Sequence, residues 1–304
     1  MNVLVTGSQG FLGRHFVAAL RRDGHMVLEW DIRGYPCVDA TLGFQNGIRD
    51  SVDLVLHCAA VSPHRAAIDE RPLAVGVGNL KLDAAMFRWA ALTRPGRVVY
   101  FSSSAVYPTD LQNDLARPRA LREDDCRVDR LNMGDPDAIY GWVKLTGERL
   151  ARAYRELGGA VTVVRPFSGY GEDQAADFPF GAFVERALRR EDPFVIWGDG
   201  GQVRDFIHVD DVVAATLAAV DAGVEGPLNL CTGAGTSMRG LAGLLCERAG
   251  YRPVFEMCPG APAGVAYRVG DPTRMRDLHV PAVDLAEGVR RALAGSSTER
   301  VRYG

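Results

Sequence analysis

The first residues of the chain hold the pattern that most restricts its fold. Residues 3–5 form a short apolar run, and residues 11–22 repeat apolar side chains with the period of a helix. Between them stand Gly7, Gly10 and Gly13. Glycines at this place permit a tight turn and let the backbone approach a pyrophosphate at the N-terminus of the helix. The pattern predicts a strand, a glycine turn and a helix, which together open a βαβ unit.

The same alternation continues to about residue 166. Further apolar strands are predicted at 26–31, 53–60, 97–102 and 160–165, with helices at 79–93 and 140–157. Strands that alternate with helices form a parallel sheet with helices on both faces. We therefore expect an α/β fold in which residues 1–166 form a Rossmann-type doubly wound parallel sheet.

After Pro166 the pattern is less regular. A Gly/Pro/Phe-rich stretch at 169–181 precedes predicted helices near 181–190 and 211–222, strands at 194–197, 204–211 and 227–230, and short helices at 236–250 and 284–294. We expect 167–202 and 233–304 to form a smaller C-terminal α/β substrate-binding lobe, and about 203–232 to return to the first domain. The polar segment 110–137 is either a surface excursion near the site or a solvated loop.

Composition excludes several classes of protein. With 304 residues, 47% of them hydrophobic and 24% charged, the chain is an ordinary globular protein, and its net charge of −3 gives no positive field for nucleic acid or an anionic membrane. It has no basic leader and no apolar run of 18 residues, so we expect a soluble, cytoplasmic protein. The six cysteines form no CxxC pair and no cluster at zinc-like spacing, so reduced thiols and no metal site are expected.

An acid follows the glycine turn at the distance that a dinucleotide site needs. Asp31 stands eighteen residues after Gly13 at the end of a predicted strand, where a carboxylate accepts the ribose hydroxyls. It favours NAD, because it would repel the 2′-phosphate of NADP. Arg33 leaves NADP open, since a guanidinium serves a phosphate or stacks on adenine. Asp39 is either an adenine contact or a surface acid. The alternative to a dinucleotide site is that the glycines only form a turn and that Asp31 caps a helix.

A tyrosine and a lysine stand four residues apart on a predicted helix. Tyr140 and Lys144 share one helical face, and a neighbouring ammonium favours the phenolate form of a tyrosine, which then acts as a base. Such a pair alone is a weak pattern. Here it follows a strand that ends in Ser102, Ser103 and Ser104, and a hydroxyl from that strand end can bridge the phenol and a substrate oxygen.

With these features in order, the sequence resembles the extended short-chain dehydrogenase/reductase family, specifically its sugar-nucleotide epimerase/dehydratase group. The resemblance spans nearly the whole chain, and the segments that carry it are TGSQGFLG (6–13), HCAA (57–60), Asn79, SSSAVY (102–107), YGWVK (140–144), VRPFSGYG (164–171), RDFIHVDDV (204–212) and YRVGDP (267–272). It implies a Rossmann-type NAD domain, a C-terminal substrate lobe and a substrate with a nucleoside diphosphate.

The resemblance also implies roles for individual residues. Tyr140 is similar to the catalytic base, Lys144 to the residue that activates it and holds the nicotinamide ribose, and Ser103 to their hydroxyl partner, while Arg204 and Arg268 resemble the arginines that clamp the substrate diphosphate. The implied cofactor contacts are Gly7, Gln9, Gly10, Phe11, Leu12, Gly13, Asp31, Arg33, Asp39, Ala40, Cys58, Ala59, Ala60, Asn79, Ser102, Tyr140, Lys144 and Pro166. The implied substrate contacts are Ser103, Ser104, Ser168, Arg204 and Arg268.

Departures from the family pattern narrow the chemistry. Ser104 and Ala105 stand where the dehydratase and decarboxylase branches carry acids and where fucose-synthase-like enzymes carry a cysteine, and Ala105 has no proton to move. The acidic stretch 123–137 remains another source of an acid. Ser168 replaces the usual asparagine and Pro108 the usual glycine, which leaves the substrate contacts there open.

The expected function is therefore NAD-dependent epimerisation of a nucleotide-diphosphate sugar at C4 through a 4-keto intermediate. The alternatives are a dehydratase or a 4-ketoreductase on the same site and, in a different class, a non-catalytic dinucleotide-sensing protein, which retention of the Ser/Tyr/Lys set disfavours. His57 and His208 are expected to be structural. The family habit implies a homodimer, with Trp89 and Trp142 in a helix–helix interface.

Overall fold

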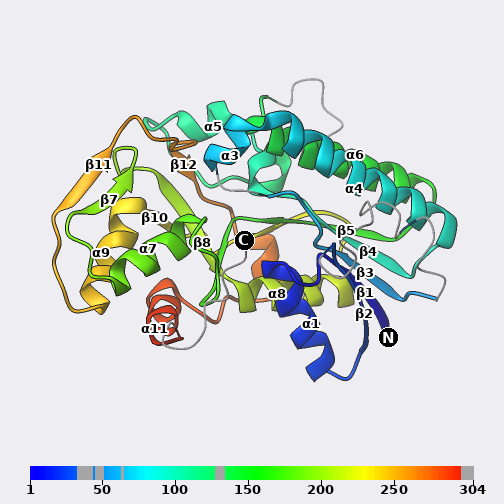
Figure 1. The fold of residues 1–304 in the computed structure, drawn as a ribbon. Coiled ribbons are helices and arrows are strands. Elements are labelled where there is room, and N and C mark those ends of the chain that lie inside the picture. The colour runs from blue at the N-terminus through cyan, green and yellow to red at the C-terminus, as the bar shows by residue number, and fades with distance from the viewer. Residues whose placement is uncertain (33–43, 45–50, 63–64, 127–133, 296–304) are drawn as a thin grey trace.

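A six-stranded parallel sheet forms the centre of the larger lobe. The computed structural model describes the whole chain except residues 33–43, 45–50, 63–64, 127–133 and 296–304 (Figure 1). The strands lie in the order β2 (Met26–Trp30), β1 (Asn2–Thr6), β3 (Leu54–His57), β4 (Arg97–Phe101), β5 (Val161–Pro166) and β9 (Gly226–Leu230), and every neighbouring pair is parallel. The predicted fold class is confirmed.

Helices cover both faces of this sheet. One face carries α1 (Phe11–Arg22) and α8 (Val209–Asp221), and the other carries α4 (Pro72–Thr93) and α6 (Ala138–Glu156) (Figure 1). Alternate side chains of a strand point to opposite faces, so Val3 and Val5 pack in the α1/α8 core and Leu4 in the α4/α6 core. Because both faces are covered, the central strands contain continuous apolar runs, as in Val3–Val5 and Leu54–Leu56, rather than alternating with polar residues.

The smaller lobe packs three helices against short strands. Its helices are α7 (Pro179–Leu188), α9 (Met238–Arg248) and α11 (Leu285–Gly295), and its strands β7 (Phe194–Trp197) and β11 (Phe255–Cys258) pair in parallel. A second sheet holds β10 (Gly235–Ser237), β8 (Val203–His208) and β12 (Tyr267–Arg268), with β6 (Ser168–Tyr170) paired to β8. The stretch 203–232 is thus divided between this sheet and the large one, and the exact domain division stays a prediction.

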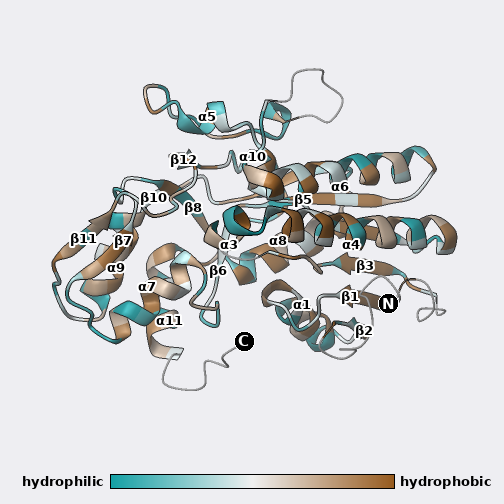
Figure 2. Ribbon diagram, turned by 45° about the horizontal axis from the view of Figure 1, so that its top comes forward, coloured by the Kyte–Doolittle hydropathy of each residue, from teal (hydrophilic) through white to brown (hydrophobic). Residues whose placement is uncertain are grey.

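The polar segment 110–137 is more than a solvated loop. It includes most of α5 (Thr109–Asn113), a hydrophilic helix in Figure 2, and the 3₁₀ turn η2 (Glu123–Asp125), and it buries Gln112, Leu121 and Cys126. Other short elements are α3 (Arg65–Glu70), η1 (Ser104–Val106) and α10 (Thr273–Arg276). None of the described helices is long and apolar enough to cross a membrane.

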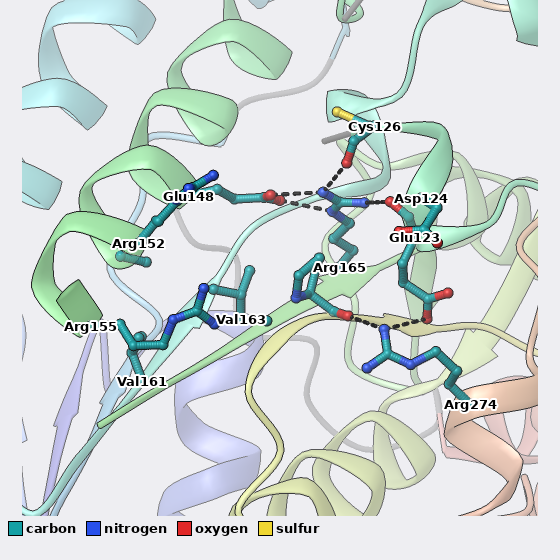
Figure 3. Close-up of a pocket in the computed structure, with 13 residues that line it drawn as sticks. Glu123, Asp124, Cys126, Glu148, Arg152, Arg155, Val161, Val163, Arg165 and Arg274 are labelled. Carbon is teal, nitrogen blue, oxygen red and sulfur yellow. Dashed lines mark hydrogen bonds and ion pairs between the residues drawn. The ribbon is translucent and has the colours of Figure 1, made fainter. Parts of the chain in front are cut away.

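A buried ion pair ties β5 to α6. Arg165 donates to Glu148 from Nε (2.8 Å) and Nη2 (2.7 Å), and both side chains are nearly inaccessible (Figure 3). Arg165 also donates to the carbonyl oxygens of Glu123 and Cys126, while Ser102 Oγ donates to Glu148 at 2.5 Å. Burial opposes the charge of Arg165, but the neighbouring Glu148 carboxylate holds the pKa of Arg165 well above its usual value. The pair fixes the strand end that carries the serines.

Removal of one partner of this pair should destabilise the fold strongly. For Glu148→Gln we expect the free energy of unfolding to fall by about 3–5 kcal/mol, because an uncompensated guanidinium stays buried. Glu156→Gln is the matched control: Glu156 pairs with Arg152 on the surface of the same helix, so its loss should cost less than about 0.5 kcal/mol. Urea unfolding of both variants measures the difference, and equal losses would contradict a dominant role for the buried pair.

Candidate active site

Two adjoining cavities form a long cleft beside the glycine turn. The first, of about 400 Å³, is lined by residues that include Asp31, Val61 and Lys81, and the second, of about 510 Å³, reaches from the glycine turn to Arg204. Gly10, Cys58 and Ala60 line both. The cleft thus follows the carboxyl ends of the parallel strands, where α/β sheets bind their ligands.

The glycine turn forms a cradle that side chains would fill. Gly7 has φ +65°, and its N–H donates to Trp30 O at 2.7 Å. A Cβ added at Gly13 would overlap the carbonyl oxygen of Gly7. No side chain caps α1, whose N-cap is Gly10, so the first N–H groups of the helix are available to an anion. These features fit the pyrophosphate of a dinucleotide.

Asp31 lies where the sequence places it. It directly follows β2, lines the first cavity, and its Oδ2 accepts the N–H of Gln9 at 3.0 Å. The acid is therefore both anchored to the turn and part of the wall that would face a ribose. Arg33, Asp39 and Ala40 lie outside the described residues, so their predicted contacts stay predictions.

The three candidate catalytic residues line the second cavity together. Tyr140 and Lys144 lie one turn apart on α6, and Lys144 Nζ is 5.9 Å from the centre of the Tyr140 ring. Ser103 is the N-cap of η1, where its Oγ accepts the N–H of Ala105 at 3.1 Å. A Cβ at Gly141 would overlap the carbonyl oxygen of Ala105, so this glycine lets α6 approach the serine turn.

Most of the other predicted contacts also line the cleft. These are Gly7, Gln9, Gly10, Phe11, Leu12, Gly13, Cys58, Ala59, Ala60, Ser102, Pro166, Ser168 and Arg204. Asn79, Ser104 and Arg268 are not among the described lining residues. Asn79 is fully buried and bonds both backbone groups of Val61, so it supports a lining residue, and Ser104 is buried within η1.

Arg204 is a desolvated cation at the far end of the second cavity. Its guanidinium donates to the carbonyl oxygens of Val203 (2.8 Å) and Ala263 (3.2 Å). Burial, together with the nearby Arg268, lowers the pKa of Arg204 to about 9. Because neither recorded acceptor is charged, an anion in the cleft would gain from this guanidinium.

Arg268 reaches the same region from the neighbouring strand, where it pairs in register with Arg204. Its Nη2 donates to Asp137 at 2.7 Å, and its Nε donates to Gln112. Asp137 also accepts from Arg65 at 2.7 Å. Burial opposes the ionisation of Asp137, but Arg268 and Arg65 lower its pKa. Arg65 also pairs with Asp69 at 2.9 Å, so three guanidinium groups and two carboxylates leave a net positive site. No sequence motif signals Asp137 or Arg65.

Sequence reasoning also missed an apolar end of the second cavity. Its walls come from the start of α7, β8 and α9, and the residues are Phe178, Pro179, Phe180, Phe206 and Met238. The Phe-rich stretch 169–181 was the only signal for part of this wall. Such flat apolar surface suits an aromatic ring of a ligand.

The two histidines considered as bases are held in the structure. His57 is fully buried between Thr6 Oγ1 (2.8 Å) and Asp83 Oδ1 (3.2 Å). His208 is buried, and its Nδ1 accepts the N–H of Asp210 at the start of α8. The described residues contain no group of three side chains that could hold a metal ion.

Fold and cleft together define a Rossmann-type dinucleotide enzyme with a tyrosine–lysine pair and an anion site. The chain belongs to the NAD dependent epimerase/dehydratase family, whose model matches residues 3–231. It is 31% identical over 300 residues to a dTDP-4-dehydro-6-deoxy-D-allose reductase of a Streptomyces species, covering 91% of this chain and 90% of the relative.

Solved structures agree with this assignment. UDP-glucose 4-epimerase of Thermotoga maritima, solved with UDP-glucose, matches with a TM-score of 0.80 and 25% identity over 98% of this chain and 99% of that one. MoeE5, solved with UDP-glucose and NAD, matches with a TM-score of 0.79 and 28% identity over 98% and 99% of the two chains. This chain is thus an NAD-dependent nucleotide-sugar enzyme by family.

A methyl group in the glycine cradle should weaken cofactor binding. For Gly13→Ala we expect NAD affinity to fall at least about tenfold and stability to fall by about 1–3 kcal/mol, because the new Cβ overlaps Gly7 O. Gly243→Ala on α9 is the control, since open space surrounds it and alanine favours a helix. Calorimetric titration with NAD measures the effect, and unchanged affinity in Gly13→Ala would rule out the cradle as the pyrophosphate site.

Proposed function

We propose that this chain interconverts a nucleotide-diphosphate sugar and its C4 epimer through a 4-keto intermediate. The observation that carries the proposal is that Tyr140, Lys144 and Ser103 line one cavity that also reaches the glycine cradle and Arg204. NAD supplies the hydride acceptor and donor of this chemistry when it is bound. The side chains of this protein handle the proton and the position of the sugar.

The proton moves through the tyrosine. The Tyr140 phenolate takes the proton of the sugar 4-hydroxyl as the C4–H bond breaks, and Tyr140 returns that proton when a hydride reaches the opposite face of the 4-ketone. Ser103 holds the reacting oxygen, and Lys144 favours the phenolate and holds the nicotinamide ribose. One proton and one hydride leave and return, so no net oxidation results.

The rest of the cleft binds the two ligands. Asp31 accepts the adenosine ribose hydroxyls, and the glycine turn holds the pyrophosphate. Arg204 and Arg268 hold the diphosphate of the substrate, and the apolar wall at Phe178–Phe180 contacts its base. In this proposal 167–202 and 233–304 act as the substrate lobe.

Dehydration is less well supported by this cavity. A dehydratase moves additional protons next to C4, yet Ala105 has no acidic group and Ser104 is buried. Among the described residues that line the second cavity, Asp173 carries a carboxylate. This carboxylate is held by Arg14 at 2.6 Å and by His15 at 3.1 Å. It is therefore occupied as a partner of α1.

A 4-ketoreductase is the second candidate. The relative at 31% identity is a dTDP-4-dehydro-6-deoxy-D-allose reductase, and a reductase uses the same tyrosine to donate a proton to the 4-ketone. The two functions differ in whether NADH is consumed, and the catalytic residues are common to both.

A substrate panel separates these functions. Purified protein is incubated with UDP-, dTDP- and GDP-hexoses, and with their 4-keto derivatives plus NADH, and the products are followed by mass spectrometry and NADH absorbance. An isomeric product without net NADH change supports the epimerase. Stoichiometric NADH loss with a 4-keto sugar shows a reductase, and a product lighter by one water shows a dehydratase. If no sugar is turned over, the remaining alternative is a non-catalytic protein that senses the dinucleotide.

Loss of the phenol should remove the chemistry but keep the binding. For Tyr140→Phe we expect kcat to fall about 10²–10⁴-fold, because the proton has no acceptor, with NAD affinity within about twofold of wild type. Tyr267→Phe on β12 is the control and should retain activity. Steady-state kinetics on the substrate found by the panel test this, and full activity of Tyr140→Phe would sink the proposed mechanism.

Loss of the desolvated arginine should weaken diphosphate binding. For Arg204→Met we expect the Kd for the matching nucleoside diphosphate to rise about 10- to 100-fold, because charge-assisted hydrogen bonds to a phosphate are lost. Arg248→Met, at the exposed end of α9, is the matched control. Isothermal titration calorimetry measures both, and an unchanged Kd would place the diphosphate elsewhere.

We also propose a homodimer formed through α4 and α6. Leu73, Val77 and Leu80 share one stripe of α4 and are exposed, as is Trp142 on the neighbouring α6, whereas Trp89 is buried inside the subunit. Light scattering should give twice the chain mass for wild type and a monomer for Leu80→Glu. The cytoplasmic location stays a prediction for cell fractionation.

A further inference from the structure

A carboxylate lies behind the active-site lysine, inside the protein. Asp83 stands in α4, is 1% exposed, and belongs to the helix that packs beside α6. Its Oδ2 accepts the hydroxyl proton of Tyr100 at 2.6 Å. Lys144, also 1% exposed, places Nζ 5.2 Å from the centre of the Tyr100 ring. Neither Asp83 nor Tyr100 is among the described residues that line the cleft.

The surroundings hold Asp83 in its charged form. Burial opposes ionisation of this carboxyl, but Lys144, His57 and Tyr100 together hold its pKa below the usual value. Burial and Asp83 raise the pKa of Tyr100 far above its usual value, so Tyr100 remains a neutral donor. The result is an anion and a cation that interact inside the protein, where charges interact more strongly than at the surface.

The histidine completes the support of the anion. Thr6 Oγ1 accepts the N–H of Ala59 at 3.3 Å, which leaves its own proton for His57 Nδ1. His57 Nε2–H then donates to Asp83 Oδ1 at 3.2 Å, and this tautomer is inferred from the hydrogen bonds. Both oxygens of Asp83 thus have a neutral donor.

Close packing of α6 holds the Asp83–Tyr100 hydrogen bond in place. Gly147 lies one turn beyond Lys144, and a Cβ there would overlap the Tyr100 hydroxyl and come within 2.8 Å of Asp83 Oδ2. The backbone of α6 therefore sits directly on the Asp83–Tyr100 hydrogen bond.

We propose that Asp83 is a positioning residue that acts through Lys144: its buried carboxylate is the counter-charge that keeps the Lys144 ammonium in place behind Tyr140. The role of Lys144 in catalysis rests on the proposed function, whereas the charge pair itself does not. The titratable groups that face this pair come from β3 and the residue after it, from β4 and from α6, and they are His57, Cys58, Tyr100, Tyr140 and Glu148.

The proposal predicts the direction in which neutralisation of Asp83 shifts the pH of phenolate formation at Tyr140. If Asp83 sustains the ammonium, its neutralisation lets Lys144 lose its proton, so the Tyr140 phenolate forms at higher pH. If Asp83 were only a nearby anion, its neutralisation would remove a repulsion and the phenolate would form at lower pH. Opposite shifts therefore separate the two accounts.

The test is a titration of Tyr140 in the NAD-loaded protein. Phenolate absorbance in the near ultraviolet is recorded against pH, and the same titration of Tyr140→Phe is subtracted to isolate Tyr140. For Asp83→Asn we expect the midpoint to rise by about one pH unit, a tenfold change. Lys144→Met should raise it as well, and adding Asp83→Asn to Lys144→Met should change nothing more. Asp69→Asn, an exposed acid of α3, is the control and should match wild type.

An unchanged or lowered midpoint in Asp83→Asn would overturn the proposal, as would a further rise in the double variant. If Asp83→Asn does not fold, Tyr100→Phe decides the matter: it removes one donor, weakens the anion and should raise the midpoint in the same direction, while a wild-type midpoint overturns the proposal. The readout needs no sugar, so absence of turnover would reject the proposed function and leave the titration to decide this inference.

Discussion

The close approach of α6 to the sheet is the constraint on which the rest of the site depends. Two glycines make it possible, because Gly141 sits against the carbonyl of Ala105 and Gly147 against the hydroxyl of Tyr100. Tyr140 and Lys144 are held at and between these two contacts. A side chain at either glycine would lift the helix and move the phenol away from the serine turn, so the position of the chemistry follows from backbone packing.

Charged side chains then hold α6 against the rest of the protein at several points along its length. Asp137, which precedes α6, pairs with Arg268 of the smaller lobe, and Glu148 near the middle of the helix pairs with Arg165 of β5. Lys144 lies between them, opposite Asp83. Each of these three charges meets a partner from a different part of the fold, and a buried charge that loses its partner is costly. The same helix therefore joins the two lobes and carries Tyr140, the proposed proton-transfer group.

The parts of the site that lie within one βαβ unit could be predicted from the sequence. The turn at Gly7–Gly13 and the Tyr140–Lys144 spacing are local patterns, and local periodicity places them on known elements. The Asp137–Arg268 pair could not, since 131 residues separate its members. The cofactor contact predicted for Asn79 stays a prediction, and no motif signalled the bonds of its amide to the backbone of Val61. Short strands such as β12 have too little periodicity to be predicted.

The proposed epimerisation requires a sugar that is held firmly at one end and loosely at the other. In the second cavity the cationic side chain at the far end is Arg204, and the polar lining includes the small hydroxyls of Ser62, Ser103 and Ser168. In this proposal guanidinium groups hold the diphosphate through charge-assisted hydrogen bonds, which do not fix the hexose. A 4-ketone held by few hydrogen bonds can then turn its other face to the same hydride donor, and each added sugar contact would favour one face and move the enzyme toward a reductase.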